Sequence, residues 1–100
     1  MEQQQFDIVR NKKTFISEPP RYEVIIHDDS ETTIDFVFMI LSVVFGKSEA
    51  EADVIVAEAQ KNGNAVVGIY SFDIAKTKIN KAHAMAYNAG FPLRFSTKKR

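Results

Sequence analysis

Acidic and hydroxyl side chains cluster where an apolar stretch gives way to a helical pattern. The cluster comprises Asp28, Asp29, Ser30 and Thr32. Carboxylates and hydroxyls can satisfy a small polar or cationic group, and a helix start adds unpaired backbone N–H donors. A strand end also gives such a loop a rigid base. The cluster therefore predicts a binding site, although the same residue types are typical of turns and helix caps, and both interpretations stay open here.

The remaining reactive side chains do not indicate catalysis or metal binding. His27 lies beside Asp28, but the other histidine, His83, is distant in the sequence and the chain has no cysteine. No zinc-ligand spacing, activated nucleophile or glycine-rich phosphate loop accompanies them. We therefore expect a protein that is not an enzyme and that needs no cofactor or metal.

The composition excludes several classes of partner. The 100 residues fit one domain, and 13 basic and 13 acidic residues leave a formal net charge of zero. No global field favours nucleic acid or an anionic membrane, and no apolar run is long enough to cross a bilayer. The lack of cysteine suits a reducing compartment. We expect a cytoplasmic monomer that binds neither nucleic acid nor membrane.

The elements that must position the cluster follow from hydrophobic periodicity. Residues 21–27 predict a strand, rich in β-branched and aromatic side chains. A helix follows, with Thr32 as its expected N-cap and Gly46 as its stop. The capping-box pattern at Ser48 to Glu51 starts a second helix, which Asn62 and Gly63 end.

The second half of the chain repeats strand and helix. Residues 64–70 predict a strand in which Gly68 marks a bulge or a close backbone approach. Ser71 is the expected cap of a third helix that ends at Gly90. Its inward face is expected to carry Ile74, Ala75, Ile79, Ala82 and Ala86. A short last strand is expected over 92–96.

This order predicts an α+β fold, a β-α-α-β-α-β sandwich whose small, three-stranded, mainly antiparallel sheet packs against three helices. We expect three segments along the chain. They are a flexible N-terminal extension over 1–20, a domain over 21–97, and a basic C-terminal end over 98–100.

Five short patterns follow one another in this order. They are Tyr22-Glu23-Val24-Ile25-Ile26; Asp28-Asp29 with Thr32 and Asp35-Phe36-Val37; Gly63, Ala65 and Gly68; Ala75-x-Thr77-Lys78; and Pro92-Leu93. Together they resemble the ClpS family, adaptors of the bacterial Clp proteases. The resemblance implies a non-catalytic adaptor that captures proteins by a bulky hydrophobic N-terminal residue, an N-degron. It also implies delivery of this cargo to the N-terminal domain of a Clp-type AAA+ unfoldase.

The resemblance assigns a role to the acidic cluster. In the family an Asn-Asp-Asp run and a His hold the free α-amine of the cargo, and without gaps these fall on Asp28, Asp29, Ser30 and Gln60. We expect Asp28, Asp29 and Gln60 to bind the amine here. Asp28 puts a carboxylate in place of an amide, and Gln60 cannot change protonation as a histidine does.

The resemblance also implies a pocket wall and a second binding surface. The wall would consist of Thr32, Ile34, Val37, Val56, Ala59 and Leu93, and the unfoldase would contact Asp73 and Lys78. Ile34 stands where the family commonly has a Met gate against β-branched residues, so we expect a pocket for Phe, Leu, Tyr or Trp that also admits Ile.

Two alternatives from other functional classes stay open. One is a regulatory module that binds the unfoldase but has lost N-degron capture through Asp28 and Gln60. The other is an interaction domain like that of the ribosomal stalk protein, since the C-terminal domain of the stalk protein resembles ClpS in fold.

Overall fold

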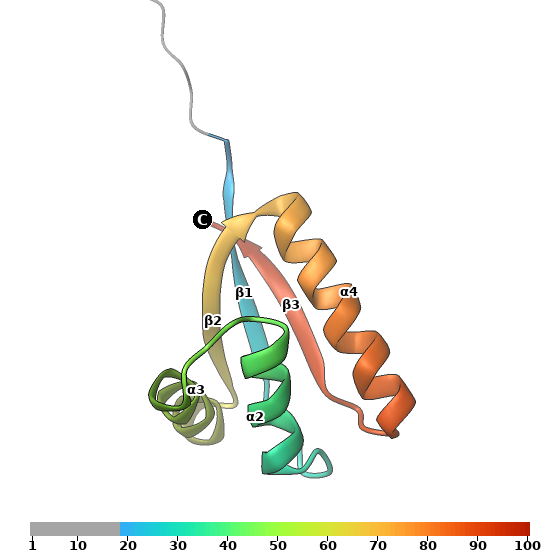
Figure 1. Cartoon of the computed structure of the whole chain (residues 1–100). Coiled ribbons are helices and arrows are strands. Elements are labelled where there is room, and N and C mark those ends of the chain that lie inside the picture. The colour runs from blue at the N-terminus through green and yellow to red at the C-terminus, as the bar shows by residue number, and fades with distance from the viewer. Residues whose placement is uncertain (1–18) are drawn as a thin grey trace, which may run out of the picture.

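The computed structural model describes residues 19–100, and the N-terminal extension expected over 1–20 lies, up to residue 18, outside the described residues. Three helices and three strands follow in the predicted β-α-α-β-α-β order (Figure 1). They are β1 (Arg21–His27), α2 (Ile34–Val43), α3 (Glu49–Asn62), β2 (Asn64–Ser71), α4 (Phe72–Ala89) and β3 (Arg94–Lys99). The predicted α+β fold class is confirmed.

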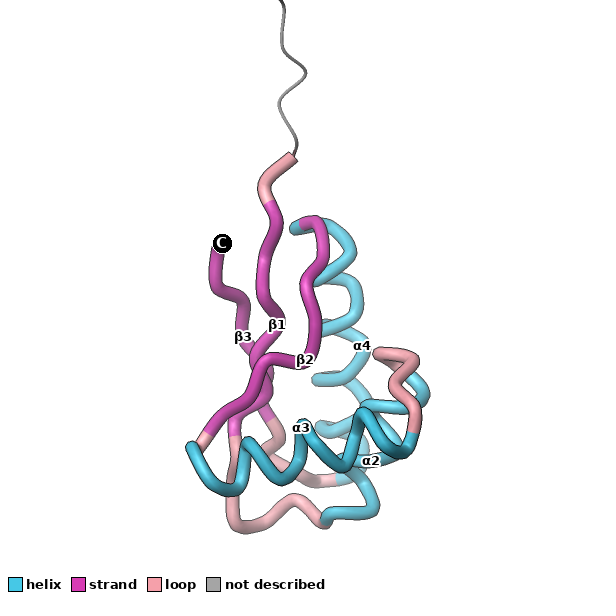
Figure 2. The backbone as a smooth tube through the Cα atoms, turned by 90° about the vertical axis from the view of Figure 1, so that its left-hand side faces the viewer, coloured by secondary structure: helices cyan, strands magenta, loops and turns pink. Residues whose placement is uncertain are grey.

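The three strands form one antiparallel sheet in the order β2-β1-β3. All three helices lie on the same face of this sheet, which leaves its other face open (Figure 2). The start of β1 and the C-terminus lie together at one end of the sheet. The strand-to-helix junction after β1 lies at the opposite end.

The helix-covered face of β1 supplies the centre of the core. Val24 and Ile26 are buried, whereas Ile25 between them faces the open side and is half-buried. This alternation is the period of two expected when one face of a strand is covered. Ile40 and Leu41 of α2, both fully buried, belong to the same hydrophobic core.

Gly68 marks a bulge, as predicted. The register of β1 and β2 shifts between Val24, which pairs with Gly68, and Ile25, which pairs with Val66, so Val67 is the extra residue. A Cβ atom at Gly68 would lie 2.7 Å from the Tyr70 hydroxyl oxygen. The atoms that crowd this position belong to the Tyr70 side chain, so the bulge is confirmed and the alternative, a close backbone approach, is not what the structure shows.

The N-cap predicted for α2 is one residue out of place. Thr33, not Thr32, is the N-cap, and its hydroxyl accepts a hydrogen bond from the Phe36 N–H at 3.2 Å. Thr32 is instead bound to the carboxylate of Asp29. Both threonines are competent caps, and this competing contact decides between them.

The ends of α3 agree with the sequence prediction. Ser48 and Glu51 form the reciprocal capping box, with N···O distances of 2.8 and 3.1 Å. Gly63 ends the helix in the left-handed conformation, at φ 88°, which a residue without a Cβ adopts at little cost. The chain can therefore turn directly from α3 into β2.

Helix α4 packs against all three strands, and its buried stripe consists of alanines and one isoleucine. Ala75, Ile79, Ala82 and Ala86 are buried as predicted, but the prediction for Ile74 is wrong, because its side chain is 51% exposed. Ile74 precedes Ala75 by one position and so lies about 100° away around the helix.

The last strand begins later and runs further than the predicted 92–96. Lys98 and Lys99 pair with Glu23 and Tyr22 of β1, so these residues of the expected basic end belong to the sheet. The Arg100 N–H donates to the Arg21 carbonyl oxygen at 3.0 Å. Its guanidinium also lies 3.7 Å from the Glu23 carboxylate.

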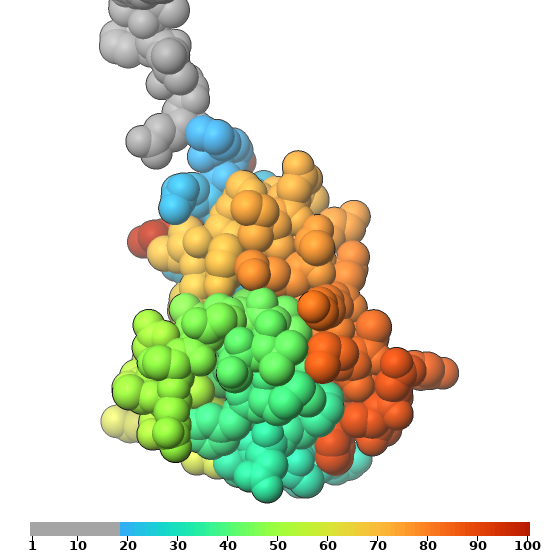
Figure 3. All heavy atoms as spheres, viewed as in Figure 1, coloured from blue at the N-terminus to red at the C-terminus, as the bar shows by residue number. Residues whose placement is uncertain are grey.

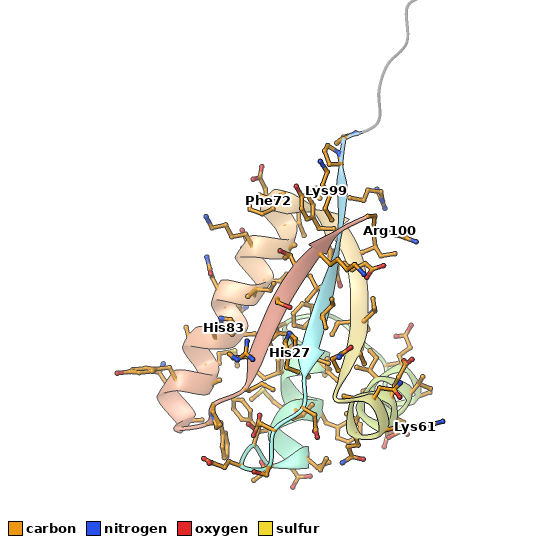
Figure 4. All side chains as sticks on the ribbon, turned by 180° about the vertical axis from the view of Figure 1, so that it is seen from behind. His27, Lys61, Phe72, His83, Lys99 and Arg100 are labelled. Atoms are coloured by element: carbon orange, nitrogen blue, oxygen red, sulfur yellow. The ribbon has the colours of Figure 1, made fainter. Side chains whose placement is uncertain are left out.

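His83 of α4 covers the outer edge of β3 (Figure 4). Its Nε2 accepts a hydrogen bond from the Phe95 N–H at 2.9 Å, which requires the neutral ring. Burial first, and the positive charge of Arg94 second, lower the pKa of His83 and favour this neutral form. The Phe95 N–H points away from β1 and cannot bond to that strand, so His83 supplies its acceptor instead.

Candidate functional site

A cavity of about 260 Å³ is lined by residues at the end of the sheet opposite the start of β1 and the C-terminus. Four segments meet around it: the end of β1 with the following loop, the start of α2, the last turns of α3, and the loop before β3. Its lining consists of Ile26, His27, Asp28, Asp29, Ser30, Thr32, Ile34, Val37, Val56, Ala59, Gln60 and Leu93.

The structure brings together all nine residues predicted for the amine site and the pocket wall, since each of them lines this cavity. The prediction omits three lining residues, Ile26, His27 and Ser30. Ile26 and His27 are the last residues of β1, so their place beside the acidic loop was available as a signal. Ser30 was aligned with the third position of the family's Asn-Asp-Asp run but was not predicted to line the pocket.

Asp29 organises the loop between β1 and α2. Its Oδ1 accepts hydrogen bonds from the N–H groups of Glu31 and Thr32 at 2.8 and 2.7 Å, and its Oδ2 accepts one from the Thr32 hydroxyl at 2.8 Å. Partial burial acts to raise the pKa of Asp29, but these three hydrogen bonds outweigh it and lower the pKa. Asp29 is therefore a charged group that holds the cavity rim in shape.

Asp28 is placed differently from its neighbour. Its N–H donates to the Gly63 carbonyl oxygen at 2.9 Å, which ties the end of β1 to the end of α3. Its carboxylate is exposed at the cavity and meets no hydrogen-bond donor among residues 19–100. Of the two acids, Asp28 therefore has the acceptor capacity available for a ligand.

The walls of the cavity are apolar. Val56, Ala59 and Leu93 are buried, with exposures of 9%, 4% and 4%. Val56 and Ala59 are three positions apart, so they share one face of α3, and the small Ala59 leaves room beside it. Ile34 is 43% exposed and stands at the rim, on the first turn of α2.

Gln60 and His27 complete the polar part of the site. Gln60 lies in the last turns of α3, exposed, where its amide offers both an acceptor and donors. The His27 ring is held by Ser96 of β3, with 2.7 Å between Nε2 and Oγ. This bond fixes the end of β1 to its neighbouring strand just before the acidic loop.

This arrangement suits a ligand with one cationic group and one bulky apolar group. A cavity of roughly 150 Å³ in another protein holds benzene, so the volume here is ample for an aromatic side chain. Among residues 19–100 no three His, Cys, Asp or Glu side chains are placed so that they could hold one metal ion together. In the same part of the chain, no helix is long and apolar enough to cross a membrane.

The two residues predicted to contact an unfoldase do not line the cavity. Asp73 is exposed in the first turn of α4. Lys78 is half-buried, and its Nζ donates to the Val44 carbonyl oxygen at 3.1 Å. Val44 is the C-cap of α2, where a positive charge is favoured by the helix dipole. Lys78 also lies 5.6 Å from the centre of the Tyr70 ring.

Known proteins with a similar sequence share one description. The family model of the ATP-dependent Clp protease adaptor protein ClpS matches residues 17–96. The ATP-dependent Clp protease adapter protein ClpS of Clostridium acetobutylicum is 43% identical over 91 residues, which cover 91% of this chain and 90% of that protein. The ClpS of Nautilia profundicola is 46% identical over 76 residues, 76% of this chain and 78% of that one.

A solved structure agrees with the sequence comparison. Agrobacterium tumefaciens ClpS2, in a complex with L-phenylalaninamide, superposes with a TM-score of 0.79 at 36% identity, covering 83% of this chain and all of that one. The relatives are described as adaptors, which are not enzymes. From the matched span and these identities, the chain belongs to the ClpS family of adaptor proteins of the ATP-dependent Clp protease.

Proposed function

We propose that this adaptor captures cytoplasmic proteins by a bulky hydrophobic N-terminal residue with a free α-amine, and delivers them to the N-terminal domain of a Clp unfoldase. The observation that carries the proposal is the combination found in one cavity. The carboxylate of Asp28, which no donor from residues 19–100 contacts, lines a pocket whose walls include Val56, Ala59 and Leu93.

The energetics favour such a ligand over other peptides. Burying a large apolar side chain contributes about 1.5–3 kcal/mol, and a hydrogen bond to a charged group about as much. Only a chain terminus presents an ammonium next to its first side chain. An internal segment of a protein would leave Asp28 without its cation, and so binds less well.

The Agrobacterium relative supports the proposal through its ligand. L-phenylalaninamide carries a primary α-amine and a benzyl side chain on the same carbon. These are the two groups for which the present cavity has complementary residues, Asp28 and the apolar wall. An N-terminal Phe presents the same pair of groups.

For the unfoldase we propose a surface at the start of α4, with Asp73 and Lys78. Neither residue lines the cavity, so cargo and unfoldase could be held at the same time. The bond from Lys78 to Val44 leaves this amine less available than Asp73. We therefore assign the larger part of the contact to the exposed Asp73.

Calorimetry with a Phe-initiated peptide and its N-acetylated form tests the capture step. Acetylation removes the positive charge, so we expect binding of the free peptide and a loss of at least tenfold on acetylation. If neither peptide binds while the unfoldase domain does, the chain is a regulatory module that lacks N-degron capture.

The pocket's choice of first residue is tested with peptides that differ only there. We propose that Phe, Leu, Tyr and Trp bind, and that Ile also enters because Ile34 stands at the rim. Equal affinity for N-terminal Leu and N-terminal Ser would contradict an apolar pocket.

A further inference from the structure

A second groove, of about 550 Å³, adjoins the cavity between α2 and the start of α3. These two helices lie side by side on the face shown in Figure 3. Ile34 lines both the cavity and the groove. A chain whose first side chain fills the cavity and which leaves past Ile34 therefore enters this groove.

The groove has an apolar floor and an acidic rim. Phe38 of α2 and the buried Ala52 of α3 contribute to the floor. The rim carries the exposed carboxylates of Asp35, Glu49 and Asp53. Within residues 19–100 none of these three forms an ion pair with a basic side chain.

One basic residue, Lys47, also lines the groove, so three carboxylates face a single ammonium. The local charge is negative although the chain as a whole is neutral. An occupant with a cationic head and an aliphatic stem would satisfy both rim and floor, because lysine and arginine side chains lay their methylene groups on apolar surface and keep their charge in water.

The spacing along α2 selects one residue of the cargo. Ile34 and Phe38 are one turn apart, about 6 Å along the helix axis. In an extended peptide, residues one and three point to the same side and lie about 7 Å apart, whereas residue two points away. The third side chain is therefore the one that reaches Phe38.

We propose that the groove is a subsite for the third residue of the captured N-terminus, and that it selects lysine or arginine there. The aliphatic stem lies over Phe38, and the cationic head lies among Asp35, Glu49 and Asp53. This inference rests on the proposed function, since it needs a first residue anchored in the cavity.

A peptide series on the full chain tests it. All peptides begin with Phe and otherwise contain Ala, with Lys, norleucine or Glu at position three, or Lys or Glu at position two. A single exposed ion pair changes affinity by about twofold to fivefold, so we expect Lys to bind about threefold to tenfold more tightly than Glu at position three. Norleucine, which keeps the stem without the charge, should fall between them, and position two should show less than a twofold difference.

Two variants of α3 locate the effect. Asp53→Asn removes a rim charge in the middle of the helix and should reduce the preference for Lys at position three by about twofold. Glu58→Gln is the matched control, because Glu58 is exposed on the same helix but lines neither the cavity nor the groove. The preference should also decrease at high salt, as for any exposed pair.

The outcomes separate this inference from the proposed function. If all the peptides bind through Phe with equal affinity, the subsite is refuted and the capture function stands. If none of them binds, the capture function fails and the subsite with it. If the preference for Lys over Glu were equal at positions two and three, or unchanged in Asp53→Asn, the preference would come from the acidic loop after β1. That result would refute the groove as a subsite for the third residue.

Discussion

Replacement of Asp28 by Ala isolates the charge that we assign to the ammonium of the cargo. Its carboxylate contacts no donor among the described residues, so the change removes no hydrogen bond within that part of the fold. The backbone bond from its N–H to Gly63 is kept. Asp28→Ala should therefore leave the free energy of unfolding within about 0.5 kcal/mol of the parent's.

The loss of affinity follows from the kind of bond removed. A hydrogen bond to a charged group contributes about 1.5–3 kcal/mol. Because Asp28 is exposed, we take the lower end of this range, and 1.4 kcal/mol corresponds to a factor of ten. We expect Asp28→Ala to bind a Phe-initiated peptide about tenfold more weakly, and Asp28→Asn, which keeps an acceptor oxygen, to lose about half of that free energy.

Fluorescence anisotropy with a peptide labelled at its C-terminus measures these affinities, and thermal unfolding of each variant checks that the fold is intact. Ser30→Ala is the matched control, since Ser30 lines the same cavity without a charge. It should change the affinity by less than twofold. If Asp28→Ala bound as tightly as the parent, or if Ser30→Ala lost as much, Asp28 would not be the residue that pairs with the ammonium.

Three further predictions concern Asp29, His83 and Gln60. Asp29→Ala removes three hydrogen bonds and should lower the free energy of unfolding by about 1 kcal/mol and weaken peptide binding. Because the pKa of Asp29 is lowered in the folded state, its contribution to stability should fade as the pH drops below about 4. If the stability of parent and variant fell equally at acid pH, this prediction would be contradicted. Because the pKa of His83 is lowered in the folded state, its ring takes up a proton at higher pH in the unfolded chain than in the folded one. The free energy of unfolding should therefore be highest above about pH 6.5 and fall below it. In denaturant titrations His83→Gln, which keeps an acceptor for the Phe95 N–H, should show a weaker dependence of stability on pH. Gln60→His should tighten binding of the Phe-initiated peptide in calorimetry, and a loss would mean that the end of α3 is not placed to reach the amine.

Local sequence signals predicted the element boundaries where the deciding contacts are local. The capping box at Ser48 and the stop at Gly63 depend on residues within one turn, and both predictions are confirmed. The cap of α2 was assigned wrongly to Thr32, because the hydroxyl of that residue binds Asp29 instead. The choice between adjacent threonines depended on a loop contact that a capping rule does not include.

Contacts between distant segments could not be predicted from periodicity or propensity. The bonds from Lys78 to Val44 and from Phe95 to His83 join elements whose relative placement depends on the packed fold. The cavity residues were found only because the resemblance to ClpS carried position-by-position information. Periodicity alone would assign Val56, Ala59 and Leu93 to the core, where they do lie by burial.

The central claim is that the cavity at the end of β1 holds an α-ammonium and a bulky apolar side chain together. Backbone amide NMR during titration with L-phenylalaninamide and with its N-acetylated form tests it most directly. We predict saturable shifts for Asp28, Gln60 and Leu93 with the free amine, and none of comparable size with the acetylated form. Shifts confined to other surfaces, or equal shifts with both compounds, would contradict the claim.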